Sequence, residues 1–164
     1  EGGAPKQITS KGKYPCWSPD GKWIAYLAYE NIGNEKYITT IFKIPREGGE
    51  AQKITTTSDY VTAGGIDWSP DGKTMAITLS VDGNPDLYLI NPEGDIISRL
   101  TKDTGISVSP TWSPDGKKIA FVSDRSGNPQ IYIMNIRTKS VRRITFKGND
   151  NTEPSWSPDG EWIA

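Results

Sequence analysis

Four aspartates recur in this chain inside one five-residue motif, Trp-Ser-Pro-Asp-Gly. Paired carboxylates can serve as acid and base in glycosidic hydrolysis, so these are the first residues to consider for chemistry. A type I turn explains them better, because serine suits its first position, proline fixes φ at the second and glycine accepts the left-handed conformation that ends it. An active site needs to be built only once, so we interpret all four as turn residues. They are Asp20, Asp71, Asp115 and Asp159, followed by Gly21, Gly72, Gly116 and Gly160.

Other reactive arrangements find little support in the sequence. Histidine is absent, which removes the commonest general base and any Ser-His-Asp or Cys-His site. Nucleophile elbows, phosphate-binding loops and zinc-ligand spacings are also missing. The run from 149 to 153 offers oxygen ligands for calcium, but it lacks the order of an EF-hand loop, and we interpret it as a plain loop. The sequence therefore predicts a chain that is not an enzyme and that holds no metal or cofactor.

Composition narrows the classes of partner. The 19 basic and 20 acidic residues give a net charge of −1, which provides no electrostatic reason to expect nucleic acid. No apolar run reaches the roughly 18 residues needed to cross a bilayer, so direct membrane insertion is not expected. The single cysteine, Cys16, cannot form an internal disulfide. The opening residues, EGGAPKQIT, resemble the interior of a longer polypeptide, and we expect this chain to be a fragment.

The spacing of the motif predicts the architecture. Its tryptophans are separated by 51, 44 and 44 residues, a period typical of propellers. Each unit contains four short apolar segments separated by tight turns, which is the content of one propeller blade. Apolar residues alternate with period two, as at Ile119 and Phe121, and no helical period is present. The fold class predicted is all-β, a β-propeller of four-stranded antiparallel blades.

The tryptophan before each turn is expected to pack between neighbouring blades. A buried tryptophan removes about 150–250 Å² from water, which corresponds to about 4–6 kcal/mol before opposing terms are counted. Anchors repeated in register would hold a stacked array together, so we interpret these residues as core rather than ligand-binding aromatics. They are Trp17, Trp68, Trp112 and Trp156.

The repeats also predict the domain organisation of this partial propeller. Residues 1–9 match the last strand of a preceding blade, and 146–164 match the start of a further one. Between them lie three blades at 10–55, 56–101 and 102–145. About three and a half blades leave open edges, which are costly and invite association. The alternative to a fragment is therefore self-association of two or more copies that close a ring.

The third unit contains a sequence pattern that is similar to a known propeller repeat. The segment SPTWSPDGKKIAFVSDRSGNPQIYIMN, with the later run RRIT, resembles the TolB-type propeller repeat (PD40, WD40-like), most densely over 75–164. The resemblance implies a six-bladed ring in a non-enzymatic periplasmic protein of the Tol-Pal system, which supports the cell envelope and cell division. It also implies the peptidoglycan-associated lipoprotein and Tol proteins as partners. Related repeats occur in prolyl-oligopeptidase-type peptidases, so a gating propeller of such an enzyme is an alternative, as is a self-assembling propeller fragment.

The loops that precede the first strand of each blade are the expected partner-binding elements. They vary while the scaffold repeats, and binding residues are often carried on such loops. We call them the inter-blade loops, and they lie at 10–14, 56–65, 101–109 and 147–153. By resemblance, they contact the lipoprotein. The candidate contact residues are Asn151, Thr152 and Glu153, with Ser107 and Ser109 behind them.

Overall fold

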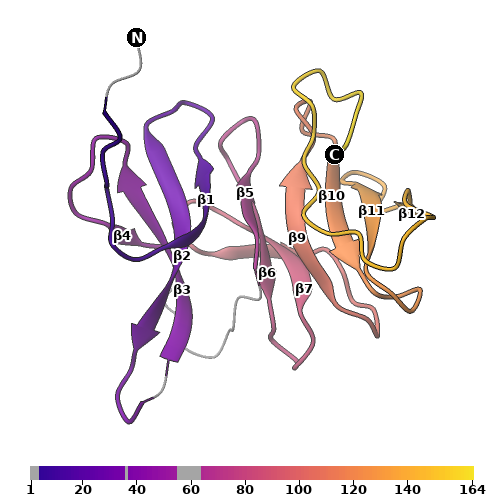
Figure 1. The fold of residues 1–164 in the computed structure, drawn as a ribbon, viewed down its shortest axis with the longest axis horizontal. Coiled ribbons are helices and arrows are strands. Elements are labelled where there is room, and N and C mark those ends of the chain that lie inside the picture. Colours follow the sequence, from indigo (N-terminus) through magenta and orange to yellow (C-terminus); the bar gives the residue numbers. More distant parts are fainter. Residues whose placement is uncertain (1–3, 36, 55–63) are drawn as a thin grey trace.

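Three separate sheets make up the molecule. The computed structural model describes residues 4–35, 37–54 and 64–164. These residues form three four-stranded antiparallel sheets that stand side by side in chain order (Figure 1). The described ranges contain no helix of the length and apolarity needed to cross a membrane. The predicted all-β fold of four-stranded antiparallel blades is confirmed.

Each sheet is a meander whose strands follow the order of the chain. The first sheet contains β1 (Lys13–Trp17), β2 (Trp23–Asn31), β3 (Tyr37–Pro45) and β4 (Gln52–Lys53). The second contains β5 (Ile66–Trp68), β6 (Met75–Leu79), β7 (Asp86–Ile90) and β8 (Ile96–Arg99). The third contains β9 (Ser107–Trp112), β10 (Lys118–Ser123), β11 (Gln130–Asn135) and β12 (Val141–Arg143). Strand β5 contacts both β1 and β9, so the first strands of the three sheets are neighbours.

The two ends of the chain are less regular than the sheets. Residues 4–12 form no strand, and the Lys6 ammonium donates to the Glu47 carbonyl at 2.6 Å, beside the turn that follows β3. The assignment of 1–9 to a preceding blade therefore stays a prediction that no strand pairing supports. At the other end, Trp156 and Ile163 form an isolated bridge across the last WSPDG turn. The predicted boundary at residues 55 and 56 lies outside the described residues.

All four WSPDG turns share one hydrogen-bond pattern. The serine hydroxyl donates to the aspartate Oδ1 at 2.5–2.7 Å and accepts the backbone N–H five residues further on at 2.9–3.0 Å. The glycine that closes each turn has φ between 66° and 73°, the left-handed region that favours glycine. The serine hydroxyl, followed by the amide two residues after the aspartate, lowers the pKa of each of these carboxyls. The aspartates are thus engaged within their own turns.

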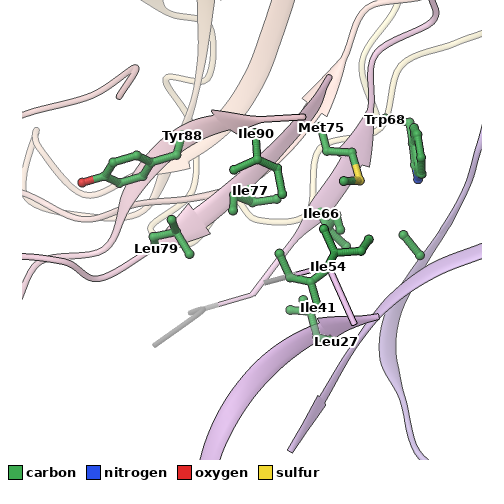
Figure 2. Packing of buried hydrophobic residues seen from close by; sticks show 11 residues of the cluster. Leu27, Ile41, Ile54, Ile66, Trp68, Met75, Ile77, Leu79, Tyr88 and Ile90 are labelled. Carbon is green, nitrogen blue, oxygen red and sulfur yellow. The ribbon is translucent and has the colours of Figure 1, made fainter. Parts of the chain in front are cut away.

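The hydrophobic core lies between the sheets rather than within one of them. One cluster joins the first two sheets and brings Leu27 and Ile41 against Ile66 and Ile77 (Figure 2). A second cluster joins the second and third sheets, and a third lies between the third sheet and the C-terminal bridge. Strands β6 and β7 are buried at every residue because both of their faces are covered. Such strands carry near-continuous apolar sequence.

Each buried tryptophan packs onto the sheet before its own. Trp68 and Trp112, both 8% exposed, belong to the first and second clusters respectively. Trp156 is partly buried against the third sheet, and its Nε1 donates to the Thr111 carbonyl at 3.2 Å. Trp17 differs from the expectation, because it is 58% exposed. The described residues place no sheet ahead of β1, so this indole has no surface to cover.

Replacement of Trp112 by alanine is expected to lower the free energy of unfolding by about 3–5 kcal/mol, the usual cost of truncating a buried aromatic side chain. Trp17→Ala is the matched control, since it removes the same side chain from the same motif in an exposed setting. Its cost is expected to stay below about 1 kcal/mol. Urea unfolding of both variants measures the difference. Equal losses would contradict the inter-sheet role of the tryptophan.

Candidate functional site

The residue three positions before each motif tryptophan has an unusual backbone conformation. Tyr14, Ser109 and Glu153 have φ of 52°, 52° and 53°, and Gly65 has φ of 85°. Positive φ is uncommon for residues other than glycine, and residues held there cost of order 1–3 kcal/mol each. The recurrence at all four equivalent positions shows that the left-handed conformation belongs to the repeat, whereas its cost falls on the three residues that are not glycine.

A β-bulge accounts for this conformation in two of the sheets. The pairing of β1 with β2 shifts register between Lys13 and Cys16, and the pairing of β9 with β10 shifts between Ala120 and Val122. A bulge inserts an extra residue, bends the strand and redirects its side chains. In three of the four repeats a proline follows the left-handed residue, and proline disfavours the right-handed α region at the residue before it.

The four left-handed residues meet in one pocket, which we call the central pocket. It has a volume of about 300 Å³ and is lined by Tyr14, Pro15, Gly65, Ile66, Ser109, Pro110, Glu153 and Pro154. All four inter-blade loops therefore contribute to it through the residues that end them. At Gly65 a Cβ atom would lie 2.6 Å from the Ser109 Cα, so the neighbouring chains approach too closely for a side chain there.

The structure separates the predicted contact residues into two groups. Ser109 and Glu153 line the central pocket. Ser107 does not, because it is fully buried and its hydroxyl accepts from Arg125 Nη2 at 3.2 Å. Asn151 is half-buried and Thr152 is exposed in the adjoining loop. Direct contact with a partner is thus open to the other four residues but not to the buried Ser107.

The loop at 147–153 is fixed to the third sheet by a small polar network. The Asn151 amide donates to the Lys147 carbonyl at 2.9 Å and to Gln130 Oε1 at 3.3 Å. Gln130 is buried, and its Oε1 also accepts from the Thr145 hydroxyl at 2.7 Å. Thr145 in turn accepts the Ile131 N–H at 2.9 Å. Asn151 therefore shapes the loop that carries Glu153.

Comparison with known proteins identifies the family. The PD40 family model, described as the TolB beta propeller domain, matches residues 4–164. The chain belongs to the TolB β-propeller family. It is 40% identical over 108 residues to the Tol-Pal system protein TolB of Desulfosudis oleivorans, a match that covers 64% of this chain and 23% of that protein.

A solved TolB structure supports the same assignment. The crystal structure of TolB from Acinetobacter baumannii has a TM-score of 0.81 and 37% identity, and the match covers 93% of this chain and 36% of that one. The chain thus spans about a third or less of the TolB relatives it matches here. A more distant relative is dipeptidyl-peptidase 5 of Porphyromonas gingivalis, 30% identical over 89 residues, which cover 54% of this chain and 13% of that protein.

The described part of this TolB-family propeller contains no group of three or more His, Cys, Asp or Glu residues placed to hold a metal ion. The central pocket combines left-handed backbone with two polar side chains. Glu153 supplies a carboxylate and Ser109 a hydroxyl, among three prolines and the Tyr14 ring. Such a surface is suited to contact another molecule.

Sequence reasoning missed one ionisable residue beside this site. Asp67 lies in β5, and its Oδ2 accepts the Trp112 N–H at 2.7 Å and the Thr111 hydroxyl at 3.1 Å, joining the second sheet to the third. Burial raises the pKa of this carboxyl in spite of these bonds. Cys16 holds the equivalent position in β1, and burial followed by the Asp67 charge raises the pKa of its thiol. The sequence does contain a signal for this residue. The position immediately before the motif tryptophan is Asp67 in the second repeat but Cys, Thr or Ser in the others.

The raised pKa of Asp67 predicts a specific pH dependence. The folded state holds this proton more tightly than the unfolded state, so the residue's contribution to the free energy of unfolding falls as pH rises from the unfolded pKa through the folded one. Asp67→Asn removes this titration and keeps an oxygen that can accept from Trp112. The stability of the variant relative to the parent is expected to rise between pH 4 and pH 7 in urea unfolding.

Asp115→Asn provides the control of opposite sign. Its folded pKa is lowered, so the native carboxylate contributes stability above the unfolded pKa and loses that contribution as pH falls. This variant is therefore expected to lose stability relative to the parent as pH rises to about 4, and to show little further change between pH 4 and pH 7. A pH-independent difference for the Asp67 variant would show that the buried carboxyl does not titrate as described.

Proposed function

We propose that this chain is part of a non-enzymatic protein-binding scaffold of the Tol-Pal cell-envelope system in the periplasm. In this proposal the face around the central pocket binds the peptidoglycan-associated lipoprotein. The observation that carries the proposal is the convergence of four equivalent left-handed residues from four repeats on one pocket. The similarity to proteins named Tol-Pal system protein TolB supplies the choice of system and of compartment.

Physical reasons favour a protein partner over a small molecule at this face. Strained backbone conformations persist only where the surrounding structure fixes them, and they cluster at binding sites. Proline rings and a positive-φ backbone give a preorganised surface, which lowers the entropy cost of association. The exposed Glu153 carboxylate and the half-buried Ser109 hydroxyl would provide polar contacts beside the 49%-exposed Tyr14 ring. Tyrosine is enriched among the residues that dominate binding energy at protein interfaces.

Charge reversal at Glu153 tests the proposal. Calorimetric titration of the full chain with the soluble domain of the lipoprotein is expected to show saturable binding. Glu153→Arg is expected to weaken it at least about fivefold, the effect of losing more than about 1 kcal/mol at an interface. Glu161→Arg is the matched control, because it reverses the same charge beside the last WSPDG turn, where the Glu161 N–H donates to Asp159.

The calorimetric titrations of the two variants distinguish three outcomes. Binding that is weakened by Glu153→Arg and unchanged by Glu161→Arg supports the central pocket as the contact. Equal effects of the two variants would contradict that placement. A folded chain that shows no binding to the lipoprotein would overturn the proposed function.

A second candidate is the gating propeller of a peptidase whose catalytic domain lies outside this chain. The match to dipeptidyl-peptidase 5 is the observation that favours it. The two candidates differ in the polypeptide that surrounds these residues. A G-x-S-x-G segment in the same gene would favour the peptidase, since such elbows carry the nucleophile in α/β-hydrolases.

A further inference from the structure

The hairpin formed by β2 and β3 is longer than its counterparts. Both strands have nine residues, whereas β6 and β7 have five and β10 and β11 have six. Their pairing runs without a break from Trp23 and Pro45 to Asn31 and Tyr37. This hairpin reaches beyond the neighbouring sheet (Figure 1). The extra length accounts for part of the 51-residue spacing that distinguishes the first repeat.

The far half of this hairpin lacks flanking strands among the described residues. The pairing of β1 reaches β2 only as far as Leu27, and β4 pairs with β3 only at Phe42 and Lys43. The segment of β2 beyond Leu27 and its partner in β3 therefore form a two-stranded extension. Strand edges of this kind present backbone donors and acceptors that an extended segment of another chain can use.

Three exposed tyrosines lie on or beside the extension. Alternate residues of a strand share one face, so Tyr29 lies on the face where Leu27 packs against the second sheet. Tyr29 pairs with Thr39, which places Tyr37 on the same face at a diagonal position. Tyr29 is 57% exposed and Tyr37 64% exposed. Together with Tyr14 we call them the tyrosine shelf.

A small pocket lies beneath the shelf. It has a volume of about 160 Å³ and is lined by Lys13, Tyr14, Leu27, Ala28, Tyr29, Thr39 and Gly64. Tyr14 and Tyr29 supply aromatic walls, and Leu27 supplies an aliphatic one. The dimensions suit a single apolar side chain of a partner rather than a complete ligand, since ligand pockets usually have about 300–1,000 Å³.

The charge beside the pocket is positive, and no described acidic residue pairs with it. The Lys13 ammonium lies 5.1 Å from the centroid of the Tyr29 ring, and within the described ranges it forms no salt bridge. Glu30, the neighbouring acidic residue of β2, points to the opposite face by strand alternation. Its carboxylate accepts from Lys53 Nζ and from the Thr40 hydroxyl, each at 2.6 Å. A carboxylate supplied by a partner would form a salt bridge with the Lys13 ammonium.

We propose that the tyrosine shelf binds an extended acidic segment of a partner protein. One apolar side chain of that segment occupies the 160 Å³ pocket, and a carboxylate two residues away, on the same side of the extended segment, pairs with Lys13. The extended form follows from the strand edges left open by the described residues, and the acidic character follows from the positive charge of Lys13 at the pocket. Tyr14 lines both this pocket and the central pocket, but Lys13 and Tyr29 line only this one, so the peptide site can be tested separately from lipoprotein binding.

The first test uses synthetic peptides and the full chain labelled with ¹⁵N. The probe is an acetylated and amidated octapeptide that repeats Val-Ser-Glu-Ser (the valine–glutamate peptide), which places the valine and glutamate side chains on the same side of an extended chain. Saturable shifts are expected at Lys13, Tyr14 and Tyr29, with a dissociation constant below about 1 mM. The matched peptides with lysine in place of glutamate (the valine–lysine peptide) and with serine in place of valine are expected to bind at least about tenfold more weakly.

Variants then assign the binding to the shelf. Tyr29→Ala and Lys13→Gln are each expected to weaken the valine–glutamate peptide at least about fivefold. Phe146→Ala is the control, because this ring is also exposed but lies outside the shelf. The amide spectrum of each variant verifies its fold. Glu153→Arg is expected to leave peptide affinity unchanged, which keeps this test separate from that of lipoprotein binding.

Three results would overturn the proposal. The first is the absence of saturable binding by the valine–glutamate peptide. The second is equal binding of the valine–lysine peptide, which would remove the role of the Lys13 charge. The third is binding that survives both Tyr29→Ala and Lys13→Gln, which would place the contact elsewhere on the molecule.

Discussion

Packing of each sheet against the one before it is the interaction on which the structure depends. A single four-stranded sheet of this size has two apolar faces and cannot bury them alone. The tryptophan that ends each first strand covers part of the preceding sheet, as Trp68 and Trp112 do. Hydrogen bonds also join successive repeats. The Asp67 carboxylate accepts from the Trp112 N–H, and Trp156 Nε1 donates to the Thr111 carbonyl. Every repeat is thus completed by its neighbour.

This packing also fixes the central pocket. The first strands of successive sheets lie side by side, so the residue three positions before each tryptophan is brought next to its equivalents. The left-handed conformations of Tyr14, Ser109 and Glu153 would be costly in an isolated strand, but here the bulges and the close approach of Gly65 to Ser109 hold the chain in place. The repeated residues form the scaffold. The chemistry of the pocket comes from the different side chains at the four equivalent positions, which are Tyr14, Gly65, Ser109 and Glu153.

Much of the fold was predictable because the sequence repeats the same turn chemistry. Ser-Pro-Asp-Gly defines a local structure from its own side chains, and the alternation that follows it predicts strands. Contact residues were harder to predict, because Ser107 and Ser109 have the same side chain and lie two positions apart. Alternation alone would place both on one face, but the register shift in β9 leaves one buried and the other at the pocket. No local pattern in the sequence specifies that bulge.

Two other features depend on the neighbours of a residue rather than on its motif. Trp17 has the same motif as Trp112 but no preceding sheet among the described residues, so its exposure could not be derived from the repeat. Asp67 occupies a position that carries small residues in the other repeats, and only the approach of β9 shows that its carboxylate joins two sheets.

Native-state hydrogen exchange tests the dependence on neighbouring sheets most directly, because it reports the opening free energy of individual amides. The account predicts the slowest exchange in β6 and β7, which are covered on both faces. Faster exchange is expected in β2 and β3, and the fastest of those amides should be the ones beyond Leu27. If the amides of β2 and β3 exchange as slowly as those of β6 and β7, the sheets are stable without their neighbours and the central claim is wrong.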